Sequence, residues 1–155
     1  MAIKITNNGG KIASTVIFIG SGEVILSAGS EIRDYSIIEM SNGVLGIGKD
    51  SVIGYFSFIQ CSGSLKIGNG SLLGPRISYI TSSHVINDKP LVGQPLDRGY
   101  IVIGDNVWLG ANITIGYNTT INDNSIIGAN SFVNKDIPKN EIWGGVPVKK
   151  IKDRL

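Results

Sequence analysis

A repeat of six residues runs through residues 103 to 137 and constrains the possible folds of this chain more than any other feature. The first position of each hexad is aliphatic throughout the stretch: Ile103, Leu109, Ile115, Ile121, Ile127 and Val133. In an α-helix each residue advances by about 100°, so residues six apart would be spread around the helix surface. A short strand followed by a tight turn instead returns every sixth residue to one face. The repeat therefore predicts a parallel β-helix.

The other positions of the hexad support this interpretation. The second position holds residues that accept a positive φ at low cost: Gly104, Gly110, Gly116, Asn122, Gly128 and Asn134. The fourth position is Asn or Asp, whose side chains bond to the backbone of turns, and the fifth is small or β-branched. We expect one strand and one turn per hexad, and three hexads, or about 18 residues, per coil.

The length of 155 residues is that of a single domain, residues 1–155, with a full core. Residues 1–18 are expected to form an N-terminal cap or an irregular first coil. The hexapeptide solenoid is expected over residues 19–138, with Ile19, Ile25 and Ile37 as its first aliphatic positions and Glu31 weakening the register. Residues 139–155 are expected to form a strand with a Gly-Gly turn and a short basic helix after Pro147.

Residues 82 to 101 interrupt the hexads. They contain two of the five prolines, Pro90 and Pro95, and the glycine and Asx positions are lost around them. We expect a loop at about 83–101 that leaves one corner of the solenoid just after His84. Loops of this length without structure of their own usually have a function.

Composition and charge exclude several classes of protein. No apolar run is long enough to span a membrane, and the N-terminus lacks the apolar core of a signal peptide, so a cytoplasmic protein is expected. Cys61 is the only cysteine and has no partner for an internal disulfide. Residues 135–155 carry six Lys or Arg against three Asp or Glu, which fits either a solvated tail or a site for a phosphorylated ligand. Nucleic-acid binding is not expected, since no reading motif is present.

His84 is the only histidine, and it lies where the regular hexads meet the predicted loop. Imidazole, with an ordinary pKa of about 6.5, is the most convenient general base at neutral pH. Because no Ser or Cys nucleophile is partnered with it, it favours direct transfer, with His84 activating an acceptor hydroxyl or amine. Asp88 or a backbone carbonyl could orient the ring. An ordinary surface histidine is the alternative.

Other residues have weaker signals. Trp108 is either a packed surface residue or a stacking wall beside a ligand. Lysines near the C-terminus have the charge needed to bind phosphate groups. Four small residues would let an extended ligand lie against backbone amides: Gly110, Ala111, Gly128 and Ala129.

Together these features resemble the hexapeptide-repeat acetyltransferases. The resemblance rests on the register, His84 before an extruded loop, IGDNVWLGAN after it, IIGANSFVNKDIP and WGGVPVKKIK, and it is tightest over residues 67–152. The motifs are most similar to sugar O-acetyltransferases related to galactoside and maltose acetyltransferases and to capsule or lipopolysaccharide acetyltransferases. The resemblance implies a left-handed β-helix, a homotrimer with active sites between neighbouring solenoids, acetyl-CoA as cosubstrate and no metal.

The resemblance also implies roles for individual residues. His84 would deprotonate the acceptor, Trp108 would flank the pantetheine arm of acetyl-CoA, and the Ala111 amide would lie near the thioester. Ala129 would contact the arm further along. The remaining positions implied to bind the cosubstrate are Gly110, Gly128, Asn134, Lys135, Lys149 and Lys152, of which the last two would reach the nucleotide phosphates. Asn134 stands where the family has Thr.

The function expected from these features is O-acetylation of a sugar hydroxyl in surface polysaccharide biosynthesis. N-acetylation of a nucleotide-linked amino sugar is the alternative, so the acceptor is a sugar or a nucleotide-sugar. A zinc-dependent carbonic anhydrase of this fold is excluded because three histidine ligands are required. An ice-binding solenoid is not favoured, because Thr114, Thr119 and Thr120 do not form one column.

Overall fold

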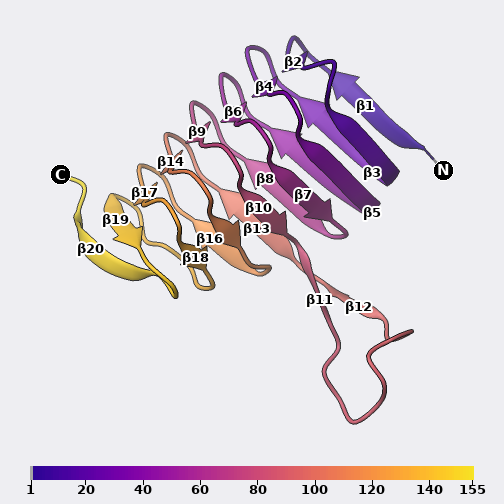
Figure 1. The fold of residues 1–155 in the computed structure, drawn as a ribbon. Coiled ribbons are helices and arrows are strands. Elements are labelled where there is room, and N and C mark those ends of the chain that lie inside the picture. The colour runs from indigo at the N-terminus through magenta and orange to yellow at the C-terminus, as the bar shows by residue number, and fades with distance from the viewer. Residues whose placement is uncertain (1) are drawn as a thin grey trace.

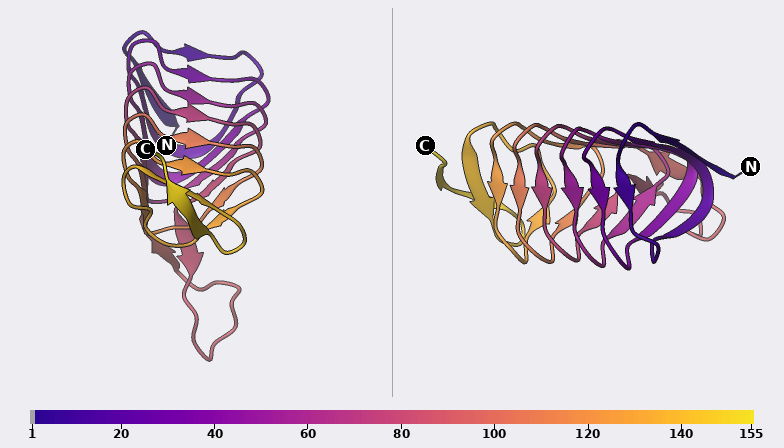
Figure 2. Two further views of the ribbon diagram at one scale, coloured as in Figure 1. Left: turned by 90° about the vertical axis from the view of Figure 1, so that its left-hand side faces the viewer. Right: turned by 90° about the horizontal axis from the view of Figure 1, so that it is seen from above.

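Residues 2–155 are described by a computed structural model and form one all-β solenoid of about seven coils. The N-terminal and C-terminal coils lie at opposite ends of the stack (Figure 1; Figure 2), and a hairpin projects from its side. All regular elements of the described residues are strands.

Each coil passes over three faces in the same order, and each face is a stack of parallel strands, except that β20 pairs antiparallel at the C-terminal end of face 2. Face 1 consists of β1 (Ile3–Asn7), the second halves of β3 (Ile17–Leu26) and β5 (Ile37–Ile47), β8 (Ser64–Ile67), β13 (Tyr100–Ile103) and β16 (Thr119–Ile121). Face 2 consists of β2 (Lys11–Ile12), β4 (Glu31–Ile32), β6 (Val52–Ile53), β9 (Leu72–Leu73), β14 (Trp108–Leu109), β17 (Ile126–Ile127), β19 (Glu141–Gly144) and β20 (Lys149–Asp153). Face 3 consists of the first halves of β3 and β5, then β7 (Phe58–Cys61), β10 (Ser78–Ile80), β15 (Thr114–Ile115) and β18 (Phe132–Val133).

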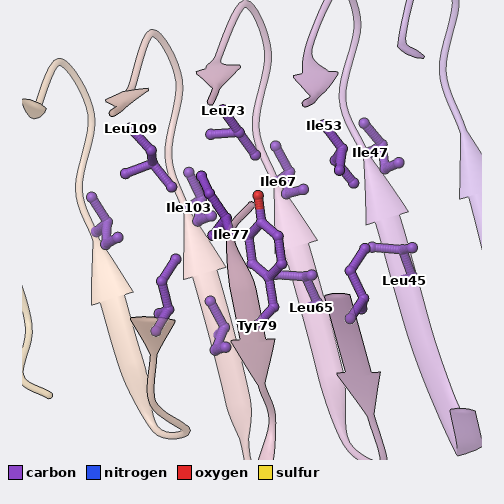
Figure 3. Close-up of a cluster of buried hydrophobic side chains, with 14 of the residues drawn as sticks. Leu45, Ile47, Ile53, Leu65, Ile67, Leu73, Ile77, Tyr79, Ile103 and Leu109 are labelled. Carbon is purple, nitrogen blue, oxygen red and sulfur yellow. The ribbon is translucent and has the colours of Figure 1, made fainter. Parts of the chain in front are cut away.

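The core is the column of first-position aliphatic residues that the hexads predicted. All six between Ile103 and Val133 have exposed fractions of 0 or 1%. The fifth positions also point inward, and their hydroxyls bond to turn carbonyls, as Thr119 Oγ1 does to the Gly116 oxygen at 2.7 Å. Figure 3 shows this core around Tyr79, whose ring lies among aliphatic side chains of neighbouring coils.

The left-handed backbone conformation falls on the fourth position of the hexad. Asn106, Asn112 and Asn124 have φ values of 54°, 59° and 60°. The second-position glycines are needed for a different reason, which is the close approach of the next coil. A Cβ atom on Gly110 would lie 2.7 Å from the backbone nitrogen of Ala129.

Two of the three corners of the solenoid are constant in length, and one is variable. The first corner lies between faces 1 and 2, and the second between faces 2 and 3. Each of these corners contains a residue in the left-handed conformation, and in most coils the two residues are six positions apart. These pairs are Gly29 and Tyr35, Asp50 and Phe56, Gly70 and Arg76, Asn106 and Asn112, and Asn124 and Asn130. The return path through the third corner takes 15 residues from Tyr35 to Asp50, 30 from Arg76 to Asn106 and 12 from Asn112 to Asn124.

The N-terminal coils depart from the predicted register. The buried positions are Leu26, Ile32 and Ile38, one residue after the expected Ile25, Glu31 and Ile37, and Ile19 is exposed. The reason is that β3 and β5 bend through the third corner as continuous strands. Their coils therefore take 20 residues from Ile17 to Ile37 and 21 from Ile37 to Phe58, against 18 from Thr114 to Phe132.

The first 18 residues, expected as a cap or an irregular first coil, already pair as a coil within the described residues. β1 pairs with β3, placing Ile3 opposite Gly22, and β2 pairs with β4.

The predicted C-terminal helix after Pro147 is wrong. Residues 149–153 instead form β20, which pairs antiparallel with β19. The physical reason is that β19 would otherwise leave an open edge of backbone donors and acceptors, which a returning strand can satisfy. Lys150 fixes this arrangement through Glu141 and Asp153, each at 2.7 Å.

Candidate active site

The predicted loop is a hairpin that leaves the third corner after β10. Its base consists of β11 (Ser82–His84) and β12 (Leu96–Arg98), which pair antiparallel with His84 opposite Leu96. The Arg98 guanidinium holds this base against the solenoid, because Nη1 donates to the carbonyls of Ser41 at 2.7 Å and Ser62 at 3.1 Å. The hairpin base, and His84 with it, is thereby fixed to neighbouring coils.

His84 lies at the end of β11 with its side chain exposed. It borders a cavity of about 260 Å³, whose other lining residues are Gln60, Ile80, Ser82, Ser83 and Leu96. The Gln60 amide donates to the hydroxyls of Ser62 and Ser82, each at 2.9 Å. Asp88 makes no hydrogen bond with the imidazole within the described part of the chain. The ring is therefore available to a ligand.

The second corner leaves the third-position backbone amides of several coils unpaired, among them those of Ala111 and Ala129. In the first corner, the Asp105 amide donates to the Asp123 carboxylate of the next coil at 2.7 Å. In the second corner, the corresponding residue above Ala111 is Ala129, which has no side-chain acceptor. Among residues 2–155, neither the Ala111 nor the Ala129 amide donates a hydrogen bond. An unpaired backbone donor favours an external acceptor.

Gly110 and Gly128 flank these amides and donate to the carbonyls of the following coil, to Ile127 at 2.9 Å and Trp143 at 2.8 Å respectively. On the face 3 side of the corner lies a cavity of about 330 Å³. Its lining residues are Asn112, Thr114, Asn130, Ser131, Phe132 and Val146. The unpaired amides therefore adjoin a hollow that an extended ligand can enter.

Trp108 lies on face 2, two residues before Gly110, and is 52% exposed. Its column continues through Ile126 and Ile142 to Lys152. Three strand spacings, about 14 Å, separate Trp108 from Lys152. Lys149 lies opposite Gly144 in the same strand pair. Trp108 and the two lysines thus lie on one side of the solenoid, next to the second corner.

The lysines of β20 differ in their charge partners. Hydrogen bonds from Lys150 and Trp143 lower the pKa of Glu141, and Asp153 and Glu141 raise the pKa of Lys150. The Lys150 side chain is therefore paired with two carboxylates that stabilise the β19–β20 strand pair. Within residues 2–155, Lys149 and Lys152 form no ion pair, so their charges are available to a phosphorylated ligand.

The structure divides the predicted site residues into two groups. The first group lies at the second corner and on face 2: Trp108, Gly110, Ala111, Gly128, Ala129, Lys149 and Lys152. The second group lies at the third corner: His84, Asn134 and Lys135, the last two in the exposed turn after β18. Face 3 separates the groups, so one chain does not bring His84 to the unpaired amides.

Residues 100–135 match the family model described as "Bacterial transferase hexapeptide (six repeats)". These residues carry the bacterial transferase hexapeptide repeat. This finding confirms the resemblance to the hexapeptide-repeat transferases and the left-handed β-helix that it implies.

Several solved structures share this hexapeptide solenoid. A variant of AntD, an N-acyltransferase from Bacillus cereus in complex with dTDP and coenzyme A, superposes with a TM-score of 0.82 at 21% identity, covering 94% of this chain and 82% of AntD. The polySia-specific acetyltransferase NeuO gives 0.67 at 17% identity, covering 99% of this chain and 87% of NeuO. A maltose O-acetyltransferase from Clostridium difficile 630 gives 0.62 at 22% identity, covering 99% and 71%. At these identities the likeness establishes the shared fold.

Residues 2–155 contain no group of three or more His, Cys, Asp or Glu side chains arranged to hold a metal ion. In the same residues no helix has the length and apolar character needed to cross a bilayer.

The sequence interpretation missed two features of the hexapeptide solenoid. One is Arg98, whose role depends on contacts with residues 36 and 57 positions away in the chain. The other is a set of exposed aromatic side chains at the second corner of the N-terminal coils: Tyr35, Tyr55 and Phe56. For Tyr35 and Phe56 the position in the hexad was the available signal, because Asn and Asp dominate the fourth position of residues 103–137.

Proposed function

We propose that the protein is an acyl-CoA-dependent acyltransferase that acts on a sugar acceptor. The observation that carries this proposal is the pair of unpaired amides at Ala111 and Ala129. They lie on one edge with exposed Trp108 and with the unpaired cations of Lys149 and Lys152. Along the solenoid axis this edge presents an aromatic side chain, backbone amide donors and then lysine side chains. These groups can bind the pantetheine arm, the carbonyl oxygens and the phosphates of an acyl-CoA molecule.

The donor would lie along the second corner, parallel to the solenoid axis. Its nucleotide phosphates would pair with Lys149 and Lys152 at the C-terminal end. Its pantetheine arm would run past Ala129 and accept a hydrogen bond there. The thioester would then reach Ala111, whose amide can bond the carbonyl oxygen.

A second copy of the chain completes the site in this proposal, in a homotrimer with parallel axes. Rotation about a parallel axis keeps equivalent coils at equal height. His84 follows β10, in the coil whose second corner carries Arg76, directly below the coil of Ala111. A neighbour's His84 would therefore approach at the height of the thioester, with Asn134 and Lys135 of the same neighbour facing the donor.

The proposed reaction is direct transfer. His84 accepts a proton from the acceptor amine or hydroxyl as the nucleophile attacks the thioester carbonyl carbon. The carbonyl oxygen gains negative charge, and the Ala111 amide donates to it. The carbon–sulfur bond then breaks, and the CoA thiolate takes up a proton, giving the acylated acceptor and free CoA.

The structural likenesses support an amino sugar acceptor more than a hydroxyl. AntD has been solved with dTDP-4-amino-4,6-dideoxyglucose and coenzyme A, and also with 3-hydroxybutyryl-CoA. Its TM-scores exceed those of NeuO and of the maltose O-acetyltransferase. We therefore place N-acylation of a nucleotide-linked amino sugar first. The O-acetylation expected from the sequence is the second candidate, favoured by the likeness to those two acetyltransferases.

Calorimetric titration with acetyl-CoA and with 3′-dephospho-CoA tests the donor site. We expect micromolar binding that weakens without the 3′-phosphate and that weakens further in Lys149→Glu. The matched control is Lys49→Glu, an exposed lysine in the N-terminal half, which should leave binding unchanged. Absence of binding at millimolar acetyl-CoA would contradict the proposal.

Turnover with a dTDP-linked amino sugar and with maltose then distinguishes the two acceptor classes. In His84→Ala we expect the turnover number to fall by about 10²–10⁴, as for a lost general base. The affinity for acetyl-CoA should stay the same, because His84 does not bind the donor. Full activity of this variant would exclude His84 as the base.

A further inference from the structure

The second corner of the N-terminal coils carries an exposed aromatic cluster. Tyr35 and Phe56 are 58% and 57% exposed, and their rings stack with centroids 5.1 Å apart at 13°. Tyr55 is 43% exposed, and the Arg33 guanidinium carbon lies 5.3 Å from its ring centroid. We call Arg33, Tyr35, Tyr55, Phe56 and Arg76 the aromatic edge.

The backbone conformation of this cluster is unfavourable for its residue types. Tyr35 has φ 62° and Phe56 has φ 57°, both in the left-handed region. Bulky side chains rarely adopt this conformation, whereas Asn accepts it readily, and Asn occupies the same corner at positions 112 and 130. Two aromatic residues are thus kept where they strain the backbone and gain little burial, which points to a function for their rings.

The aromatic edge and the unpaired amides form one continuous line. In the second corner the fourth-position amides that follow Tyr35 donate to the third-position carbonyl of the preceding coil. These bonds join Phe56 to Asp34 at 3.1 Å, Arg76 to Tyr55 at 2.8 Å, Asn112 to Pro75 at 2.9 Å and Asn130 to Ala111 at 3.0 Å. Phe56 is therefore two coil spacings, about 10 Å, from the coil of Ala111.

The chemistry of the aromatic edge fits a nucleotide. Flat exposed rings bind a base by stacking, largely without regard to its identity. Arg76 is exposed and forms no ion pair in residues 2–155. Arg33 is shared with Glu31 at 3.3 Å. Guanidinium groups bind phosphate oxygens in pairs, so a diphosphate next to a stacked base would meet Arg76 on the way to Ala111.

We propose that the aromatic edge binds the nucleoside diphosphate part of the acceptor, with the base against Tyr35 and Phe56 and the diphosphate at Arg76. This inference rests on the proposed acyl transfer, because the thioester end of the acyl-CoA proposed above would point toward the aromatic edge. The sugar would then lie between Arg76 and Ala111, at the height of a neighbour's His84.

Titration of dTDP into the full-length protein without CoA tests this inference, and a Phe56→Asn variant makes the test sharp. We expect dTDP affinity to fall about 10-fold or more in Phe56→Asn, the scale of one lost base stack. The thermal midpoint should rise, because Asn relieves the left-handed strain. Acetyl-CoA affinity should not change. The matched control is Tyr100→Thr, which removes an exposed aromatic side chain from face 1 and should leave dTDP binding intact.

Three outcomes would overturn the inference. The first is that dTDP does not bind the wild-type protein at millimolar concentration, or binds Phe56→Asn equally well. The second is that inorganic pyrophosphate binds as tightly as dTDP, which would remove the base from the site. The third is that Phe56→Asn lowers the mass of the assembly in light scattering, which would make a second copy the partner of the rings. Acetyl-CoA binding is measured in the same samples, so failure of the donor site is separable from failure of the aromatic edge.

Discussion

Replacing Tyr79 by Phe should stabilise the protein, although Tyr79 is at the centre of the core. The residue is completely buried, and its hydroxyl has no hydrogen-bond partner in the described residues. It occupies a position that is aliphatic in most other coils, and its ring lies among Leu65, Ile67 and Leu73 (Figure 3). The substitution removes one oxygen and keeps the shape of the ring.

The size of the effect follows from two opposing terms. A buried hydroxyl without a partner costs about 1–3 kcal/mol of folding free energy relative to its hydrated state. The void left by one oxygen, roughly 10 Å³, costs about 0.2 kcal/mol. We therefore expect Tyr79→Phe to raise the free energy of unfolding by about 1–3 kcal/mol.

The pH dependence gives a second signature of the same burial. Desolvation raises the pKa of the Tyr79 phenol far above its ordinary value, so the folded protein keeps the proton while the unfolded chain loses it above about pH 10. The wild type accordingly loses about 1.4 kcal/mol of stability per pH unit above that value through this one group. The Phe variant does not, and its advantage should grow as the pH rises.

Urea denaturation of both proteins at one protein concentration, at pH 7 and at pH 10.5, measures both effects. Tyr100→Phe is the control, because Tyr100 is 42% exposed and should show neither. A Phe variant less stable than the wild type at pH 7 would refute the reasoning. It would mean that the hydroxyl is satisfied in solution, for example by a buried water molecule.

Two further substitutions test the packing of the coils and the anchoring of the hairpin. Gly110→Ala should lower the free energy of unfolding by about 1–3 kcal/mol, because the new Cβ meets the Ala129 backbone. Gly116→Ala has more room around the new Cβ and should have little effect in the same urea titration. Equal effects of the two substitutions would contradict the close-approach explanation. Arg98→Ala should speed proteolysis of the hairpin and lower the turnover number without changing acetyl-CoA affinity, since it positions His84 without touching substrate. Arg98→Lys should restore part of both, and an unaltered cleavage rate in Arg98→Ala would show that the hairpin base is held by other contacts.

The C-terminal half of the fold could be predicted from the sequence because each hexad reports its own geometry. From Ile103 to Val133 every predicted core residue is buried. The N-terminal register could not be predicted, because the two or three extra residues at each bend leave the hexad period intact on either side and only shift its phase. The prediction of a C-terminal helix was wrong for a non-local reason. β20 is stabilised by pairing with the edge of β19, which forms only when the stack of coils is complete.

The candidate site could be predicted only as a set of residues. Trp108, Ala111 and Ala129 could be named as candidates because they lie within the most regular hexads. Their separation from His84 by face 3 could not be predicted, because it depends on the corner from which the hairpin projects. That corner can be assigned only when the hexads of every preceding coil are assigned to the correct face. The unpaired amide of Ala111 can be recognised only by comparing coils. At the first corner the Asp123 carboxylate accepts a hydrogen bond from the Asp105 amide. At the second corner the equivalent residue is Ala129, whose side chain has no acceptor.

The unequal corners separate the part of this solenoid with fixed spacing from the part with variable spacing. Two corners are locked at six residues by contacts from coil to coil, whereas the third contains a plain bend in β5, a tight turn after β15 and the whole β11–β12 hairpin. An insertion at the third corner leaves the stacking of every other coil in place. In the proposed acyltransferase, exchanging this one loop would therefore change the acceptor site without disturbing the coils, and grafting a foreign hairpin between Thr81 and Gly99 is the direct way to attempt it.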